Sequence, residues 1–253
     1  MYDLTELTLE NVTDIGIALR NLGRGADSLE TVAERCVQYF YENLRDFDTG
    51  EPACALTRFF KTHNYGGLPA PLQQYSRDLM AQTATIPDEV KCLTLLATAG
   101  EKGEWCDRTA SKGHQAIPLT SEKAVSNIPM ISQLIQGFGL DISYVLAPDP
   151  RLLMEIERKT FNVFYIPAAA GSEFIPAQAE FVEPFGIQSV LGFGGMLPSG
   201  NLFAIILFSK VAIPEATARL FKTLPLSIKI AMIPFDQDTL FDQDTLFQPL
   251  QTV

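Results

Sequence analysis

The sequence predicts an α+β domain: a mainly antiparallel central sheet of about five or six strands, flanked by helices. Three features support this class. A helical pattern over residues 28–45 precedes the first strand-like run, a glycine-marked β-hairpin spans residues 189–209, and a helical segment over residues 214–233 follows it. The chain has 253 residues, of which 47% are hydrophobic and 19% charged, so it can bury a sizeable core.

The N-terminal segment is predicted to form two amphipathic helices. Residues 1–25 form a lead-in helix whose apolar positions recur at helical spacing: Leu9, Val12, Ile15, Leu19 and Leu22. Glycines at positions 23 and 25 end it, and Asp27 or Ser28 can cap the second helix.

Two strands are expected next, over residues 53–62 and 90–98, with a short helix over residues 72–80 between them. Residues 99–120 are polar and irregular. We expect them to form a long loop, and long loops in compact domains are often functional.

The middle of the chain, about residues 120–185, is predicted to be an insertion in the domain. Its apolar spacing predicts one helix over residues 121–138, a strand over 142–146, a helix from Asp149 to Arg158 and a strand over 161–166.

The hairpin is the clearest local signal. Residues 189–196 and 202–209 form its strands, and Pro198, Ser199 and Gly200 lie in the turn. The second strand is apolar throughout, which predicts burial on both faces and a central position. Pro214 suits the first position of the last helix, which Pro225 should kink.

Residues 236–253 are predicted to form an acidic tail or linker after a domain over residues 26–235. The segment DQDTLF at 236–241 recurs at 242–247, and two copies are too few for a repeat fold.

Charge and composition exclude several classes of protein. The net charge of −11 makes nucleic acid an unsuitable partner. No apolar run approaches a membrane span of about 20 residues, and the N-terminus lacks signal-peptide features, so we expect a cytoplasmic protein that binds no membrane. Four cysteines without a CxxC pair, and two histidines, give no support for a metal site.

Several segments resemble a known family. SLETVAERCVQYFYENL before ACALTRFFKT, and GIQSVLGFGGMLPSGNLFAIILFSK before PEATARLFKTLPLSIKIAM, look like a GAF domain, with a central antiparallel sheet and its terminal helices packed together on one face. KCLTLLATAGEKGEWCDR, HQAIPL and SVLGFGGMLPSGNLFA are similar to the N-terminal sensory region of bacterial two-component sensor histidine kinases.

The resemblance implies a sensory domain that binds an unknown small ligand. The signal would pass through the terminal helices to a histidine kinase or response-regulator output module, and a homodimer is expected. No phospho-acceptor histidine helix or ATP-binding module follows residue 235, so we expect no enzymatic activity from this chain alone. The cofactor, if any, is unknown.

The polar loop carries four of the candidate ligand-binding residues. Trp105 could stack on a ligand, Arg108 could bind an anionic group, and His114 could give polar recognition. Cys106 lies near Lys102, Arg108 and Lys112, and nearby cations lower a thiol pKa. An ordinary surface loop is the alternative.

The first predicted strand carries three further candidates, Arg58, Phe60 and His63. In an alternating strand Arg58 and Phe60 share a face, so an inward Arg58 would be an anion anchor. The alternative places Arg58 at a solvated edge.

Other functions stay open as alternatives. A thiol enzyme would pair Cys106 with His114, oriented by Asp107. A dimerisation scaffold would have a filled core and no pocket. Haem, metal or a covalent bilin has no supporting spacing around the histidines and cysteines.

Overall fold

The computed structural model describes residues 1–80, 85–148 and 162–236. Among these residues, six strands form one antiparallel sheet in the order β5-β4-β3-β8-β7-β6. Their bounds are β3 Cys54–Asn64, β4 Lys91–Gly100, β5 Ala116–Pro118, β6 Phe164–Ile166, β7 Ser189–Met196 and β8 Leu202–Ser209. A separate pair, β1 Tyr2–Asp3 and β2 Leu44–Arg45, is parallel. The predicted α+β class is confirmed, and the antiparallel sheet, expected to have about five or six strands, has six.

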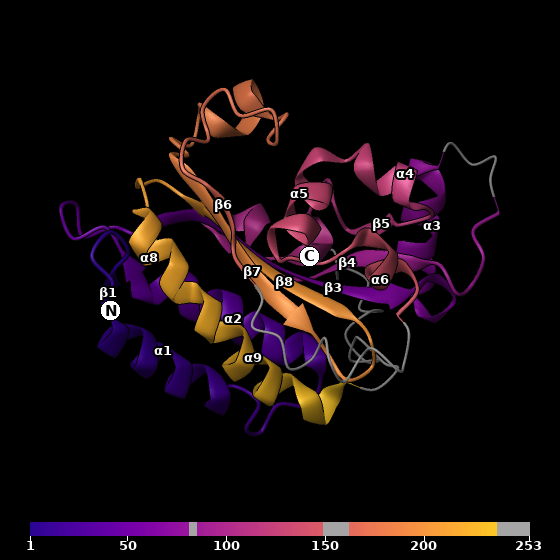
Figure 1. Ribbon diagram of the computed structural model, residues 1–253, viewed down its shortest axis with the longest axis horizontal. Helices are drawn as coiled ribbons and strands as arrows, with labels where there is room; N and C mark the ends of the chain where they lie inside the picture. The colour runs from indigo at the N-terminus through magenta and orange to yellow at the C-terminus, as the bar shows by residue number, and fades with distance from the viewer. Residues whose placement is uncertain (81–84, 149–161, 237–253) are drawn as a thin grey trace, which may run out of the picture.

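The first and last helices cover one face of the sheet (Figure 1). This layer contains α1 (Leu9–Asn21), α2 (Leu29–Asn43), α8 (Glu215–Leu220) and α9 (Leu224–Met232), while α3 (Ala70–Leu79) packs beside β5. Ser28 caps α2 by accepting a hydrogen bond from the backbone of Thr31, as expected for a serine at this position. Helix α9 packs against both α1 and α2, so the lead-in helix belongs to the same core as the sheet.

Shorter elements cover the opposite face (Figure 1). They are α4 (Glu122–Ser126), α5 (Pro129–Gly137), α6 (Ile142–Leu146) and a π-helical turn over Gln178–Val182. The two faces carry separate hydrophobic clusters, which we call the α2-side core and the α5-side core. Strand β8 contributes Phe203 and Ile205 to the first and Ala204 and Ile206 to the second, which explains its continuous apolar sequence.

Two elements predicted in the middle of the chain differ from the structure. The helix predicted over residues 121–138 is two helices, because Pro129 has no N–H to continue the first and instead begins α5. The strand predicted over 142–146 is the helix α6, which buries Ile142 and Val145 at helical spacing against α4 and α5. These local contacts override the strand propensity of a short apolar run.

The last helix is interrupted rather than kinked. A 3₁₀ turn over Phe221–Thr223 separates α8 from α9, and Pro225 lies in the first turn of α9. Strand β6 is shorter than the predicted 161–166, and the helix predicted from Asp149 lies outside the described residues. No helix in the described ranges is long and apolar enough to cross a membrane.

Candidate functional site

Arg58 lies on the α5-side face of the sheet. It is opposite Ile206 on β8, and Phe60 is opposite Ala204 on the same strand. Ile206 and Ala204 both belong to the α5-side core, so Arg58 and Phe60 share a face, as predicted. Phe60 is 5% exposed and forms part of that core, which leaves Arg58 as the polar group of the pair.

The Arg58 guanidinium has few partners for a charged group in this position. One terminal nitrogen, Nη2, donates to the Ser111 hydroxyl at 3.2 Å. Nε is buried and, among the described residues, has no hydrogen-bond partner, and no carboxylate there forms an ion pair with this arginine. Burial lowers the pKa of Arg58, and only Tyr75 opposes that effect. A guanidinium in this state can accept a carboxylate or phosphate as its counter-ion.

His114 lies close enough to Arg58 for the two to interact electrostatically. Surrounding protein atoms lower the pKa of His114 by desolvation, and the positive charge of Arg58 lowers it further, although the residue retains an exposed side. The backbone of His114 has φ of 63°, in the left-handed region that costs free energy for a residue other than glycine. Its N–H donates to the Tyr75 hydroxyl at 2.8 Å, which helps to hold this conformation.

The polar loop brings Ser111 and His114 to Arg58 because it follows the edge of β4 beyond β5. At one end the backbone N–H of Glu101 donates to Ala55, and at the other the N–H of Leu95 donates to Gln115. Thr98 lies opposite Arg58 on β4, and its buried Oγ1 also lacks a partner among the described residues. The Arg58 site, meaning Arg58, Thr98, Ser111 and His114, therefore contains two buried polar atoms without partners, and buried polar groups normally have them.

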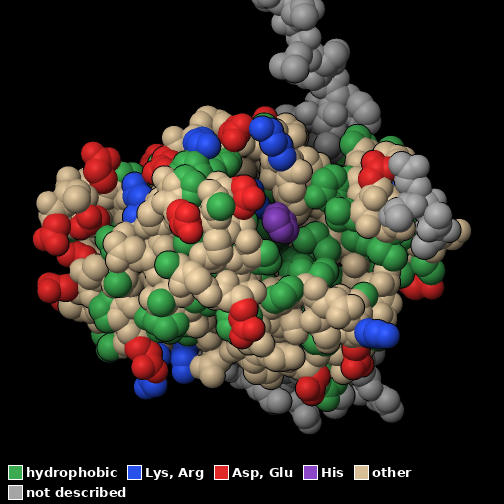
Figure 2. Space-filling view, turned by 90° about the horizontal axis from the view of Figure 1, so that it is seen from above, with side chains coloured by type: hydrophobic (Ala, Val, Ile, Leu, Met, Phe, Trp, Pro, Cys, Tyr) green, Lys and Arg blue, Asp and Glu red, His purple; other side chains and the backbone are tan. Residues whose placement is uncertain are grey.

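Figure 2 shows the molecule from this side. Hydrophobic side chains form the floor of a hollow, and a histidine lies at its edge. Trp105 packs against the aromatic residues of the α5-side core, with ring centroids 4.6 Å from Phe185 and 5.6 Å from Phe181. Trp105 therefore anchors the loop to the π-helical segment.

Arg108 has a structural partner. Its side chain, 9% exposed, forms an ion pair with Glu30, whose side chain is 11% exposed, in the first turn of α2. The ion pair ties the polar loop to the helix layer. A ligand would have to compete with the Glu30 carboxylate for this arginine.

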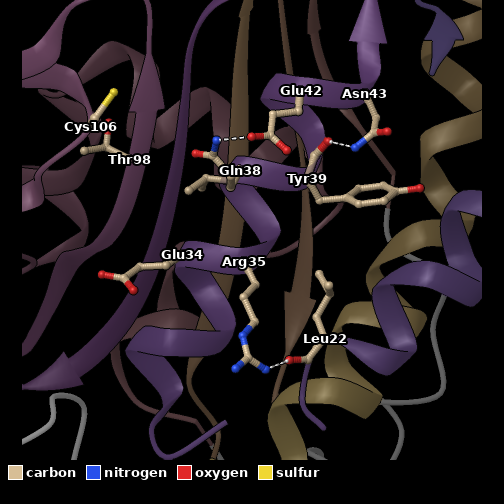
Figure 3. Close-up of a pocket in the computed structure, with 10 residues that line it drawn as sticks. Leu22, Glu34, Arg35, Gln38, Tyr39, Glu42, Asn43, Thr98 and Cys106 are labelled. Atoms are coloured by element: carbon tan, nitrogen blue, oxygen red, sulfur yellow. Dashed lines mark hydrogen bonds between the residues drawn. The ribbon is translucent and has the colours of Figure 1, made fainter. Parts of the chain in front are cut away.

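Cys106 is an exposed residue of the polar loop. Its thiol donates to the backbone carbonyl of Gly100 at 3.2 Å, and within the described residues it makes no hydrogen bond to His114. Figure 3 shows Cys106 and Thr98 at one side of a groove of about 590 Å³ along α2. The helix groups in this groove are bonded locally; for example, Arg35 donates to the carbonyl of Leu22 at 2.9 Å.

His63 lies five residues beyond Arg58 on β3, on the α2-side face. It is 5% exposed and lines a pocket of about 570 Å³ at the end of the sheet, beside Gly67. The structure therefore brings Arg58 and His114 together, with Phe60 on the same face of the sheet as Arg58. It places His63 in a different pocket and pairs Arg108 with Glu30.

Ser111, Thr98 and Tyr75 were not expected from the sequence. Nothing in the sequence pointed to Thr98, whereas Ser111 lies within the polar loop that the sequence indicated as a candidate site.

Compared with models of protein families and with curated proteins, the sequence has no match. Within the described residues, no group of three or more His, Cys, Asp or Glu could hold a metal ion.

Proposed function

We propose that this chain is a cytoplasmic, GAF-like sensory domain of two-component signalling, which binds a small anionic ligand at the Arg58 site. The observation that carries the proposal is the half-buried Arg58: among the described residues its Nε has no hydrogen-bond partner, and its one hydrogen bond is to a neutral hydroxyl. An anion entering there would neutralise the guanidinium and supply the missing acceptor.

The architecture supports the GAF-like part of the proposal. That resemblance implies a central antiparallel sheet with the terminal helices packed together on one face. The six-stranded sheet is antiparallel, and α2 packs against α9 on one of its faces. Arg58 lies on the opposite face of the sheet, where it is paired with Ile206 of the α5-side core.

The polar loop offers a physical connection between the site and the helices. Ser111 contacts Arg58, and three residues earlier Arg108 pairs with Glu30 in the first turn of α2. A ligand that favours one loop position would shift the position of α2 by its difference in affinity for the two arrangements. Helix α2 would then transmit the change to α9 and to a kinase or response-regulator partner.

Helix α9 and the 3₁₀ turn that follows it, Ile233–Phe235, also carry an exposed apolar stripe that suits a homodimer. Leu226, Ile230 and Ile233 are 62%, 45% and 48% exposed at a spacing of four and three residues. Burying such a stripe against a second copy would remove apolar surface from water. It is also the observation that favours the second candidate function, a dimerisation scaffold without a ligand.

Native mass spectrometry of protein purified without added ligand tests the proposal. We expect a mass above 27.9 kDa per chain that disappears on denaturation. Arg58→Met, purified in parallel, should lack the adduct. Arg219→Met is a matched control, because Arg219 is 66% exposed in a surface pair with Glu215 and its loss should leave the adduct in place.

The ultraviolet–visible spectrum of the same sample would reveal a chromophore. Thermal shift with small carboxylates and phosphates would detect a ligand too weak to survive purification. The ligand site would be refuted by three results together: a mass without an adduct, no visible absorption, and no anion-dependent rise in melting temperature that requires Arg58. The dimerisation scaffold would then remain as the function. A thiol enzyme would require His114 to activate Cys106, and the two side chains are not hydrogen-bonded to each other.

A further inference from the structure

The two faces of the central strands differ in how completely they are covered. On the α2-side face, β3 and β8 present apolar residues that are 0% exposed: Phe59, Phe203, Ile205 and Leu207. Around Arg58 on the other face, the same strands present four apolar residues that retain 3–7% exposure, which we call the apolar floor: Leu56, Phe60, Ile206 and Phe208. Ile206 is opposite Arg58, and the two residues on β3 precede and follow it at the spacing of one strand face.

Helix α5 covers a different part of this face. A methyl group added at Gly192 of β7 would be 2.7 Å from Leu134 of α5, so the helix packs closely over β7, and it also contacts β6. The apolar floor lies on the neighbouring strands. On this side of the molecule a hollow with a hydrophobic floor is open to solvent (Figure 2). Apolar surface in a hollow, with a few polar groups beside it, is typical of small-molecule sites.

Aromatic side chains adjoin the apolar floor at Phe208. The ring centroid of Phe181, in the π-helical turn, is 5.0 Å from that of Phe208, and the Trp105 centroid is 5.6 Å from that of Phe181. Phe181 and Trp105 both retain partial exposure. An apolar group beside Arg58 therefore has aliphatic residues beneath it and aromatic residues within reach on one side.

The polar groups of the site suit a single carboxylate. Arg58 Nε and Thr98 Oγ1 lie on paired positions of β3 and β4, and both are buried without a hydrogen-bond partner among the described residues. Both can donate, and the two oxygens of a carboxylate can accept from both. A phosphate would bring further charged oxygens against the apolar floor, where burying them without partners costs free energy.

We infer that the Arg58 site takes a monocarboxylic acid with an apolar body, its carboxylate on Arg58 and Thr98 and its body on the apolar floor. This inference rests on the function proposed above and narrows its ligand from small anions in general. Binding removes the body and the floor from water together, so affinity rises with the apolar area of the ligand.

Isothermal titration calorimetry of the full chain at fixed ionic strength tests the inference with five compounds: acetate, butyrate, hexanoate, 1-hexanol and inorganic phosphate. Each methylene buried on the apolar floor should strengthen binding about fourfold, which corresponds to about 0.8 kcal/mol. Hexanoate should thus bind about 15-fold more tightly than butyrate, and butyrate more tightly than acetate by the same factor. 1-Hexanol has the body without the charge and phosphate the charge without the body, so both should bind about tenfold or more weakly than hexanoate.

Three variants assign the binding to the named side chains. Arg58→Met should bind hexanoate no more tightly than 1-hexanol, because recognition of the charge is lost. Thr98→Val keeps the shape of the side chain and should weaken hexanoate binding about tenfold. Its melting temperature should match or exceed that of the wild type, because the lost hydroxyl has no described partner. Thr13→Val, at an exposed threonine of α1, is the matched control and should leave binding unchanged.

The outcomes separate this inference from the function on which it rests. Arg58-dependent binding in which acetate or phosphate equals hexanoate would overturn the inference and leave anion binding in place. Equal binding of hexanoate and 1-hexanol, unaffected by Arg58→Met, would refute the anion site and the inference together. Absence of binding by every compound would refute both as well.

Discussion

Replacing Arg58 with methionine should stabilise the ligand-free protein while abolishing anion binding. Methionine is similar in length and would lie between Leu56 and Phe60 on the apolar α5-side face. The change removes a desolvated cation that lacks a described ion-pair partner. It also loses one hydrogen bond to Ser111, whose hydroxyl keeps its bond to the carbonyl of Gly113 at 2.8 Å.

The magnitude follows from these two effects. A buried, unpaired charge costs several kcal/mol, reduced here because Arg58 retains some exposure. A hydrogen bond with one charged partner offsets about 1.5–3 kcal/mol of that cost. The expected net gain for Arg58→Met is about 1–2 kcal/mol in the free energy of unfolding, or about 2–8 °C in melting temperature.

Urea unfolding followed by Trp105 fluorescence measures the change, with Arg219→Met as the surface control. The control should stay within about 0.5 kcal/mol of the wild type. An anion that binds the wild type should raise its unfolding midpoint and leave Arg58→Met unchanged. If Arg58→Met were destabilised by about 1 kcal/mol or more, Arg58 would be a structural residue, and the reasoning that assigns it to a ligand would be refuted.

Three further predictions concern the polar loop and the thiols. Because the pKa of His114 is lowered in the folded protein, the unfolded chain binds its proton first as the pH falls below about 6.5, so stability should decline there. His114→Asn, which tolerates the left-handed backbone, should decline less between pH 7.5 and 5.5 in urea titrations; equal declines would contradict the assignment. Arg108→Met leaves the Glu30 carboxylate without its buried partner and should cost about 3 kcal/mol, and a calorimetric loss below 1 kcal/mol would show that the pair is solvated. In native protein a thiol reagent should label Cys106 rapidly and spare buried Cys36, whose pKa is raised by burial, and rapid labelling of more than one thiol per chain would contradict the described packing.

The fold was largely predictable where local patterns and tertiary packing agree. The hairpin over residues 189–209 matches β7 and β8 in both strands, because β8 is apolar enough to require burial on both faces. The sequence indicated the break at Pro129, because proline cannot continue a helix, but the predicted helix over residues 121–138 ran through it. The helix α6 had none, because five residues are too few for periodicity to distinguish a helix from a strand.

The site was predictable only in part. Alternation along β3 correctly placed Arg58 and Phe60 on one face. It could not show that His114 would lie beside Arg58, because that depends on the path of an irregular loop along β4. The partner of Arg108 was equally inaccessible, since Glu30 lies 78 residues away in the sequence. The burial of Lys61 had a signal in the sequence, because alternation along the strand places Lys61 on the same face as the buried Phe59.

The packing of α1 against α9 has a consequence for synthesis on the ribosome. Arg20 of α1 donates to Ser227 of α9 at 3.1 Å, and these residues are 207 positions apart. Gly16 lies so close to α9 that an added methyl group would be 3.1 Å from the Ser227 hydroxyl. At about 5–20 residues per second, translation leaves α1 without this partner for roughly 10–40 s after it emerges. During that interval its apolar face is exposed to the cell, so we expect the nascent chain to depend on chaperones until α9 has emerged.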